Sequence, residues 1–374
     1  MVKDTYYTYK EIMQQPAMWQ KEYELLLNQR EEIESFISKY IGLGYEIIFS
    51  GAGTSAFIGD ILELSLCGTR FRSARSVATT DIISHPYTYF SNEQKLLLIS
   101  FARSGNSPES MGTIRLANSI CKEIAHIYIT CNSEGELARS ANKDNTLLLL
   151  LPPETNDESL AMTSSFSTML FTCMAIANIG VLESQRSMIE SLVKKSALVL
   201  SSYDEKIREI ASKSFNRAIF LGSGEKKGVA EESHLKLQEL TDGSVLCVMD
   251  SFLGFRHGPK AVVNNQSVLV YLFSSDPDVL RYEIDLVKQI NANNKVVAQI
   301  AVSGSKISIP GVDFDLEVIL DCDEKQHDIY SSIPYVFTAQ LLGFYKSIDM
   351  GLNPDSPSLS GNISRVVEGV TIYS

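Results

Sequence analysis

Short runs of apolar, often β-branched residues alternate with longer helical patterns along most of the chain. Clear examples are residues 96–100 (LLLIS), 126–130 (HIYIT) and 268–272 (VLVYL). Strand-length runs that alternate with helical segments are typical of a parallel sheet covered by helices on both faces. The pattern therefore predicts an α/β fold built from doubly wound parallel sheets.

The pattern also occurs twice. Residues 46–60 resemble residues 217–231, since each has an apolar strand, a Gly-x-Gly turn and the start of a helix. The other matching pairs are 96–100 with 268–272, 126–130 with 296–300, 146–151 with 316–320, and the apolar helices 164–180 with 329–350. The separation stays near 170 residues throughout, which chance similarity would not maintain. The sequence thus predicts two tandem flavodoxin-like units.

Chain length supports this division, because 374 residues suit two domains of roughly 150–170 residues each. The predicted segments are a helical lead-in at 1–45, a first unit at 46–186, a connecting helix pair at 187–215, a second unit at 216–350 and a surface tail at 351–374. Ligands of such sheets bind beyond the carboxyl ends of the strands. The loops at 50–55, 100–107 and 222–226 are therefore the segments to inspect.

Composition narrows the function classes. A net charge of −12 without a basic stripe argues against nucleic-acid binding. The six cysteines, 67, 121, 131, 173, 247 and 322, are scattered without ligand spacing, which predicts reduced thiols, no metal site and a cytoplasmic protein. The N-terminus lacks an apolar signal core, and no run approaches the ~18 apolar residues of a membrane span, so no membrane association is expected.

The first loop reads Ser50-Gly51-Ala52-Gly53-Thr54-Ser55. Glycines allow the backbone to approach a ligand, the amides of the next helix point at it, and the hydroxyls of Thr54 and Ser55 can bind an anion. An ordinary strand-to-helix turn is the alternative. A dinucleotide cofactor is disfavoured, because Ala56 takes the sixth fingerprint position and no acidic residue ends the next strand-like segment. No cofactor is predicted.

The second loop, residues 100–109 (SFARSGNSPE), follows an apolar strand and opens a helix, with hydroxyls at Ser104 and Ser107. Two loops rich in Ser and Thr at adjacent strand ends form a neutral, donor-rich site. Together they predict a site for one phosphate monoester.

These loops resemble those of the SIS (sugar isomerase) family, which read Gly-Thr-Ser and Ser-x-Ser-Gly-x-Thr. The resemblance implies phosphate binding by Thr54, Ser55, Ser104 and Ser107, with backbone help from Gly53. Three positions depart from the pattern: Ala102 stands for a Ser, Arg103 for a Gln and Ser107 for a Thr. One hydroxyl is lost and one cation, Arg103, is gained, so phosphate binding is still expected.

The second unit contains Lys236-Leu237-Gln238-Glu239 and, further on, His257-Gly258-Pro259. Residues three apart share one helix face, and Lys236 with Glu239 alone would more often form a surface salt bridge. Both motifs together are similar to the isomerase half of glucosamine-6-phosphate synthase. The resemblance implies ring opening by His257, proton transfer between C1 and C2 by Glu239, and charge stabilisation by Lys236. It also implies a homodimer, because the family's His reaches the site from a neighbouring subunit.

The tail segment Asn362-Ile363-Ser364-Arg365 resembles a synthase segment that lies over the sugar, with Arg365 in place of a Lys. Arg cannot release a proton as Lys can, so only charge stabilisation is expected of it. The tail at 351–374 is accordingly expected to cover the active site.

The chain's two ends, 11–19 (EIMQQPAMW) and 365–373 (RVVEGVTIY), resemble the galactosamine-6-phosphate deaminase/isomerase group, also named tagatose-6-phosphate ketose/aldose isomerase. The resemblance implies conversion of D-galactosamine 6-phosphate to D-tagatose 6-phosphate and ammonia. Simple aldose/ketose isomerisation, a deglycase acting on fructosamine phosphates and a non-catalytic sugar-phosphate sensor remain alternatives. Expected partners are a phosphorylated amino sugar or ketose and a second subunit.

Overall fold

The computed structural model describes residues 3–293, 295–321, 329–366 and 369–373. Cys322, Val367 and Glu368, which enter the sequence argument, lie outside the described residues. The chain divides into two compact units. The first-sheet unit comprises Ala17–Asp157, Met162–Glu190 and Ile363–Ser374, and the second-sheet unit comprises Met1–Pro16, Glu158–Ala161 and Ser191–Asn362. Each unit is described by itself.

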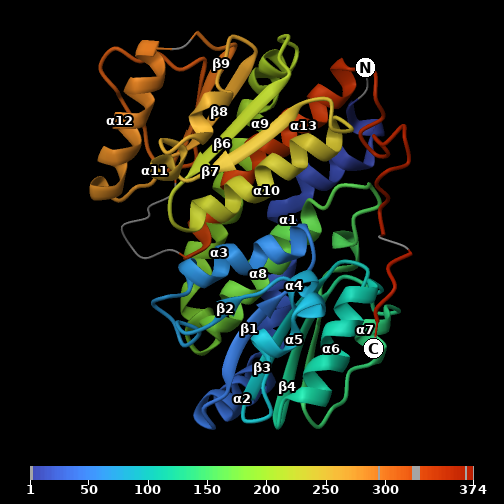
Figure 1. Cartoon of the computed structure of the whole chain (residues 1–374). Helices are drawn as coiled ribbons and strands as arrows, with labels where there is room; N and C mark the ends of the chain where they lie inside the picture. Colours follow the sequence, from blue (N-terminus) through green and yellow to red (C-terminus); the bar gives the residue numbers. More distant parts are fainter. Residues whose placement is uncertain (1–2, 294, 322–328, 367–368, 374) are drawn as a thin grey trace. The chain divides into compact units, whose positions relative to one another are not determined.

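The first-sheet unit contains five parallel strands in the order β2-β1-β3-β4-β5 (Figure 1). The strands are β1 (Glu46–Ser50), β2 (Arg75–Ser76), β3 (Lys95–Ala102), β4 (Glu123–Thr130) and β5 (Thr146–Leu150). The helices are the Ala17–Asn28 part of α1 (Tyr7–Asn28), then α2 (Arg30–Gly42), α3 (Thr54–Ser65), α4 (Thr79–Ser84), α5 (Pro86–Tyr89), α6 (Pro108–Ile120), α7 (Glu136–Arg139) and α8 (Ser164–Ala177). Short 3₁₀ segments lie at Pro153–Thr155 and Ile179–Gln185.

The core of this unit follows from its apolar strands. In β3, every residue after Lys95 is buried, as expected for a parallel strand covered on both faces. Ile48, Leu98 and Tyr128 pack with Met111 and Ile114 of α6. Helix α3 packs against α8, all of whose residues are buried.

Helix α8 is part of the segment that comes nearest to a membrane span in length and composition. Among the described residues no single helix is long and apolar enough to span a membrane. One bent pair, α8 with Ile179–Ala211, meets the length and composition of a broken span, with a bend of 107°. The complete burial of α8 is what a core helix shows, and core helices meet the same criteria.

The second-sheet unit repeats the strand order as β7-β6-β8-β9-β10, again all parallel (Figure 1). The strands are β6 (Arg217–Gly222), β7 (Leu246–Asp250), β8 (Ser267–Leu272), β9 (Ala298–Ser303) and β10 (Leu316–Ile319). The helices are most of α9 (Arg186–Ala211), then α10 (Glu225–Leu240), α11 (Phe252–Phe255), α12 (Pro277–Asn293) and α13 (Phe337–Asp349), with 3₁₀ segments at Lys3–Thr5, Pro259–Val262 and Ile329–Val336. Helix α10 packs against α13, and α11 against α12.

The predicted fold class is confirmed: two five-stranded parallel sheets have the same order, with helices before the first. Three details of the prediction were wrong. The helix pair expected at 187–215 is one helix, α9. The apolar helix expected at 329–350 is a 3₁₀ segment followed by α13, since Pro334 provides no N–H for a helical bond. The other apolar helix, expected at 164–180, ends at Ala177.

Candidate active site

The first predicted phosphate loop forms a tight turn between β1 and α3. A Cβ atom on Gly51 would lie 2.5 Å from the carbonyl carbon of Ser55, so only glycine fits there. Gly53 has φ +55° and ψ −128°, a conformation that glycine adopts without strain. Helix α3 then begins at Thr54, and Thr54 and Ser55 are each 5% exposed. The turn therefore presents the N-terminus of a helix, with its partial positive charge, next to two hydroxyls.

The second predicted loop connects β3 to α6. Ser107 caps α6: its Oγ accepts from the Ser110 N–H at 3.3 Å and donates to Ser110 Oγ at 2.6 Å. Ser104 Oγ accepts from the Asn106 N–H at 3.3 Å, and its carbonyl accepts from Asn132 Nδ2 at 2.9 Å. Ser107 thus has a structural role in helix capping that the resemblance did not indicate.

The two loops leave neighbouring strands. Strands β1 and β3 pair in register, with their last paired residues Ser50 and Ser100 side by side. The chain continues from β1 to β2 on one side and reaches β3 on the other. This reversal is the topological switch point where open α/β sheets bind ligands. The predicted hydroxyls thus lie just beyond the carboxyl ends of β1 and β3, where a ligand of such a sheet binds.

The two predicted arginines contact each other. Arg103, 6% exposed, donates from Nη2 to the carbonyl oxygen of Arg365. Arg365 donates from Nε to the carbonyl of Asp157 at 2.8 Å and from Nη2 to Asn156 Oδ1 at 3.1 Å. The Arg103 guanidinium therefore ties the tail to the loop after β3, and the Arg365 guanidinium ties it to the loop at 156–157. The sequence did not reveal these structural uses.

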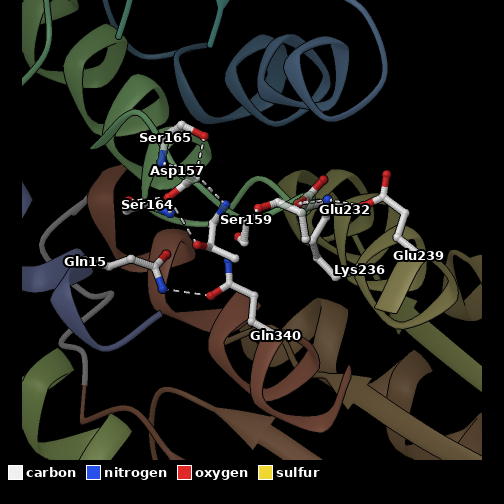
Figure 2. Close-up of polar contacts among 11 residues, drawn as sticks. Gln15, Asp157, Ser159, Ser164, Ser165, Glu232, Lys236, Glu239 and Gln340 are labelled. Carbon is white, nitrogen blue, oxygen red and sulfur yellow. Dashed lines mark hydrogen bonds and ion pairs between the residues drawn. The ribbon is translucent and has the colours of Figure 1, made fainter. Parts of the chain in front are cut away.

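Asp157 caps the start of α8 with a buried carboxylate, 1% exposed (Figure 2). It accepts from the N–H groups of Thr163, Ser164 and Ser165 at 2.9, 3.2 and 3.0 Å. It also accepts from the hydroxyls of Ser164 and Ser165, each at 2.5 Å. The sequence analysis did not find this group, because Asp157 stands six residues before Thr163 and so outside the usual N-cap position.

A second buried carboxyl lies in the same unit. Glu22 of α1 is 1% exposed and accepts from Thr172 Oγ1 of α8 at 2.9 Å. Among the described residues its other oxygen, Oε2, has no hydrogen-bond partner. Burial raises the pKa of the Glu22 carboxyl to about 8, although the Thr172 bond acts to lower it. At neutral pH Glu22 is therefore mostly protonated.

In the second-sheet unit, α10 carries a lysine between two carboxylates (Figure 2). Lys236 Nζ lies 2.6 Å from Glu239 Oε2 and 3.5 Å from Glu232 Oε1. The side chains of Lys236 and Glu232 are 1% and 0% exposed, whereas Glu239 is 23% exposed. The buried ammonium is compensated on both sides, as a buried charge requires. Glu239 is the member of the three that solvent reaches, and so the one that a ligand can reach.

Glu232 is the member of this group that the sequence analysis missed. Its signal was available, because Glu232, Lys236 and Glu239 are spaced by four and three residues and share one face of α10. The predicted pair of Lys236 and Glu239 is joined directly. Lys236 is buried and Glu239 is partly exposed, so the pair is not a fully solvated surface salt bridge.

His257 lies in an exposed turn after α11. Phe252 and Phe255 anchor α11 in the core, and the His257 N–H donates to the Gly254 carbonyl at 2.9 Å. In the described part of the chain, no hydrogen bond or ion pair joins His257 to Lys236 or Glu239. The structure therefore brings Lys236 and Glu239 together but not His257.

The described residues contain no group of three or more His, Cys, Asp or Glu side chains that could hold a metal ion. Five cysteines, Cys67, Cys121, Cys131, Cys173 and Cys247, are free thiols. The chemistry available is thus that of carboxylates, an ammonium group, an imidazole and hydroxyls.

The combination of two such sheets, a hydroxyl-lined switch point and a Lys–Glu pair is that of phosphosugar isomerase domains. The chain belongs to the SIS domain family, whose model matches residues 45–179. This confirms the resemblance found in the sequence.

Individual relatives are more specific. The chain is similar to D-galactosamine-6-phosphate deaminase AgaS of Shewanella sp. (strain ANA-3), with 35% identity over 98% of this chain and 92% of that protein. It is 36% identical to the protein of the same name from Escherichia coli, over 98% of this chain and 95% of the relative. Among solved structures, tagatose-6-phosphate ketose/aldose isomerase from Escherichia coli matches with a TM-score of 0.89 at 34% identity, covering 98% of this chain and 96% of that one.

Proposed function

We propose that this protein is an amino-sugar-phosphate deaminase/isomerase that converts D-galactosamine 6-phosphate to D-tagatose 6-phosphate and ammonia. The observation that carries the proposal is the buried Lys236, held between Glu232 and the accessible Glu239. It occurs in a chain that is 35–36% identical, over nearly its whole length, to relatives named D-galactosamine-6-phosphate deaminase.

The substrate phosphate binds at the switch point of the first sheet. Thr54, Ser55 and Ser104 donate hydroxyl hydrogen bonds, and the amides that follow Gly53 add the N-terminal field of α3. Ser107 contributes mainly by capping α6 and so shaping the loop. Arg103 adds positive charge beside the loop while it holds the tail.

The reaction begins with ring opening, in which His257 moves a proton onto the ring oxygen. Glu239 then takes the proton from C2 of the open-chain amino aldehyde, which leaves an enolamine. The same carboxyl returns the proton to C1, and a second proton passes from the nitrogen to O1, which gives the C2 ketose imine. Water adds to C2 and ammonia leaves, so one water is consumed for each ammonia released.

Lys236 stabilises the negative charge that develops on the sugar oxygen as the C2 proton leaves. Glu232, fully buried on the opposite side, keeps the lysine charged and fixes its position. Arg365 keeps its permanent charge but cannot relay a proton. Its contribution is to fasten the tail, because its guanidinium binds the carbonyl of Asp157 and its own carbonyl accepts from Arg103.

The finer assignments follow from the same proposal. Release of ammonia by water makes the reaction a hydrolysis. The exposed position of His257 suits donation into a neighbouring subunit's site, which makes the protein a homodimer. The shared strand order of the two units supports an ancestral duplication. The free cysteines support a cytoplasmic location.

Simple isomerisation is the second candidate, and the solved relative named tagatose-6-phosphate ketose/aldose isomerase favours it. Incubation with galactosamine 6-phosphate and glucosamine 6-phosphate, with ammonia and ketose phosphate assayed together, separates the two. We expect one ammonia for each ketose phosphate, with galactosamine 6-phosphate preferred. A higher kcat/KM for a non-amino aldose phosphate than for either amino sugar phosphate would overturn the deaminase assignment.

A further inference from the structure

The second sheet has a strand-to-helix turn of the same shape as the phosphate turn of the first. A Cβ atom on Gly222 would lie 2.2 Å from the carbonyl oxygen of Lys226, just as one on Gly51 would collide with Ser55. Gly224 has φ +60° and ψ −134°, nearly the values of Gly53. Helix α10 therefore begins with its N–H groups directed as those of α3 are.

The neighbouring loop also has a counterpart. Strands β6 and β8 pair side by side, as β1 and β3 do, so the loops after them share one sheet edge. After β8, Ser274 Oγ accepts from the Asp276 N–H at 3.1 Å. After β3, Ser104 Oγ accepts from the Asn106 N–H at 3.3 Å. We call residues 51–55 with 103–107 the first-sheet loops, and residues 223–226 with 273–276 the second-sheet loops.

The second-sheet loops already hold a carboxyl group from their own unit. Glu283 of α12 is 0% exposed, and its Oε2 accepts from the Ser274 N–H at 2.9 Å. A hydrogen bond from Ser223 and the charge of Lys226 lower the pKa of the Glu283 carboxyl, but burial outweighs them and raises it. The other oxygen, Oε1, is buried and has no hydrogen-bond partner among the described residues.

Lys226, whose charge acts on Glu283, is buried as well. Lys226 is 2% exposed, and its Nζ donates to Glu225 Oε1 at 2.8 Å. The same Nζ lies 5.0 Å from the centroid of the Tyr335 ring. Glu283 thus accepts hydrogen bonds from an N–H group and a hydroxyl, and the charge of an ammonium group acts on it. These are the kinds of group that bind a phosphate elsewhere.

We propose that the carboxylate of Glu283 occupies, in the second-sheet unit, the place that the substrate phosphate takes in the first-sheet unit, and closes the second-sheet loops to phosphosugars. Carboxylate and phosphate oxygens accept the same hydrogen bonds, and a tethered group forms them without loss of translational freedom. The chain therefore binds one phosphosugar, and Glu283 fixes which sheet does so. This inference rests on the phosphate site proposed above for the first-sheet loops. The test must therefore distinguish a failure of that site from a failure of the role proposed for Glu283.

The stoichiometry of the unmodified protein is the first test. Equilibrium dialysis with radiolabelled inorganic phosphate is expected to show one bound phosphate per chain. Two per chain would overturn the inference, because the second-sheet loops would then be open. No bound phosphate would leave the second-sheet loops closed and would instead contradict the site proposed in the first-sheet unit.

Opening the loops is the second test, in a Thr54→Ala/Ser104→Ala background that weakens the first-sheet site. Glu283→Ala removes both the charge and the bulk, so inorganic phosphate is expected to raise its Tm by about 2–4 °C. Glu283→Gln keeps the bulk and is the matched control, which phosphate should not stabilise. Equal effects of phosphate on the two variants would overturn the inference. If Glu283→Ala does not fold even with phosphate present, the number of phosphates bound per unmodified chain decides whether the inference holds.

Discussion

The turn after β1 and the turn after β6 share a backbone and differ in chemistry. Gly53 and Gly224 have nearly the same φ and ψ, and each turn has a further glycine whose Cβ would collide with the next helix. The first turn leads to Thr54 and Ser55, which are small hydroxyl donors. The second leads to Glu225 and Lys226, which pair with each other. The same backbone turn thus serves the proposed substrate phosphate in one unit and internal charges in the other.

The helices that follow these turns also differ, in length and in the residues they carry. Helix α3 has 12 residues and α10 has 16. With Gly53 aligned to Gly224, Lys236 falls on Ser65, the last residue of α3, and Glu239 falls beyond its end. The extra turn of α10 therefore carries the proposed proton-transfer group. The first-sheet unit supplies the binding loops, and the second supplies a longer helix with a buried ion pair.

The largest expected effect is on kcat, and it tests whether α10 carries the group that transfers the proton. Glu239→Gln keeps the shape of the side chain but cannot accept a proton, so kcat should fall about 10²- to 10⁴-fold with KM little changed. Glu225→Gln, at the other end of the same helix, is the matched control and should keep its kcat. Steady-state kinetics with galactosamine 6-phosphate measures both. Equal losses in the two variants would place the proton transfer elsewhere.

Within the second-sheet unit, His257 is exposed whereas Glu239 is half-buried. Mixing two inactive variants tests whether both residues act in the same chain or in different subunits. An inactive Glu239→Gln variant mixed with an inactive His257→Ala variant should recover about a quarter of the original activity. Half of randomly mixed dimers would be hybrids, and each hybrid would hold one intact site. Subunit exchange, followed by native mass spectrometry, is the control. Exchange without recovery would show that His257 does not act across subunits.

Buried acids also distinguish the two units. Lys236 compensates Glu232 and Glu239 in the second, whereas Glu22 in the first is buried with only a hydroxyl donor. Because its pKa is raised to about 8, the folded protein binds a proton that the unfolded chain releases above its ordinary value near 4.5. Between these two values the unfolded state binds fewer protons, so this group makes stability fall as pH rises.

Glu22→Gln removes that titration. The free energy of unfolding of the variant, relative to the unmodified protein, should increase by about 3–5 kcal/mol between pH 5 and pH 8. Urea unfolding at several pH values measures the difference. Glu154→Gln, which replaces an exposed carboxylate of the same unit, is the control and should show no such rise. A pH-independent difference for Glu22→Gln would mean that Glu22 is ionised in the folded protein.

The sequence predicted the parts of the molecule that depend on local pattern. Strands β3 and β8 are continuous apolar runs, and the glycine turns and the spacing of Lys236 and Glu239 are short-range features. It failed where distant residues meet. Arg103 and Arg365 lie 262 residues apart, and each has enough reach for many partners, so their hydrogen bond depends on the tertiary fold.

Buried carboxylates were missed for a related reason. Asp157 stands among polar neighbours, and Glu283 lies between Tyr282 and Ile284 in a helical pattern. Nothing local shows that either carboxyl is enclosed at a helix start or a strand end. Their environment depends on which loops the sheet brings beside them. Pro334, by contrast, was a visible local signal within an apolar run, and its effect on the helix was underestimated.

The smallest expected effect compares the two matched turn serines. Ser104 and Ser274 each follow the strand beside the glycine turn, and each Oγ accepts one backbone N–H two residues on, so loss of that bond affects both alike. If Ser104 also binds the substrate phosphate, Ser104→Ala should raise KM about ten- to a hundredfold, as expected for loss of a hydrogen bond to a charged group. Ser274→Ala should leave KM unchanged, because Glu283 is held by the Ser274 N–H, which alanine retains. Both variants should keep kcat and Tm nearly unchanged, since these partly exposed loop hydroxyls stabilise no core. Equal changes in KM would mean that the first-sheet serine, like its counterpart, serves only the turn.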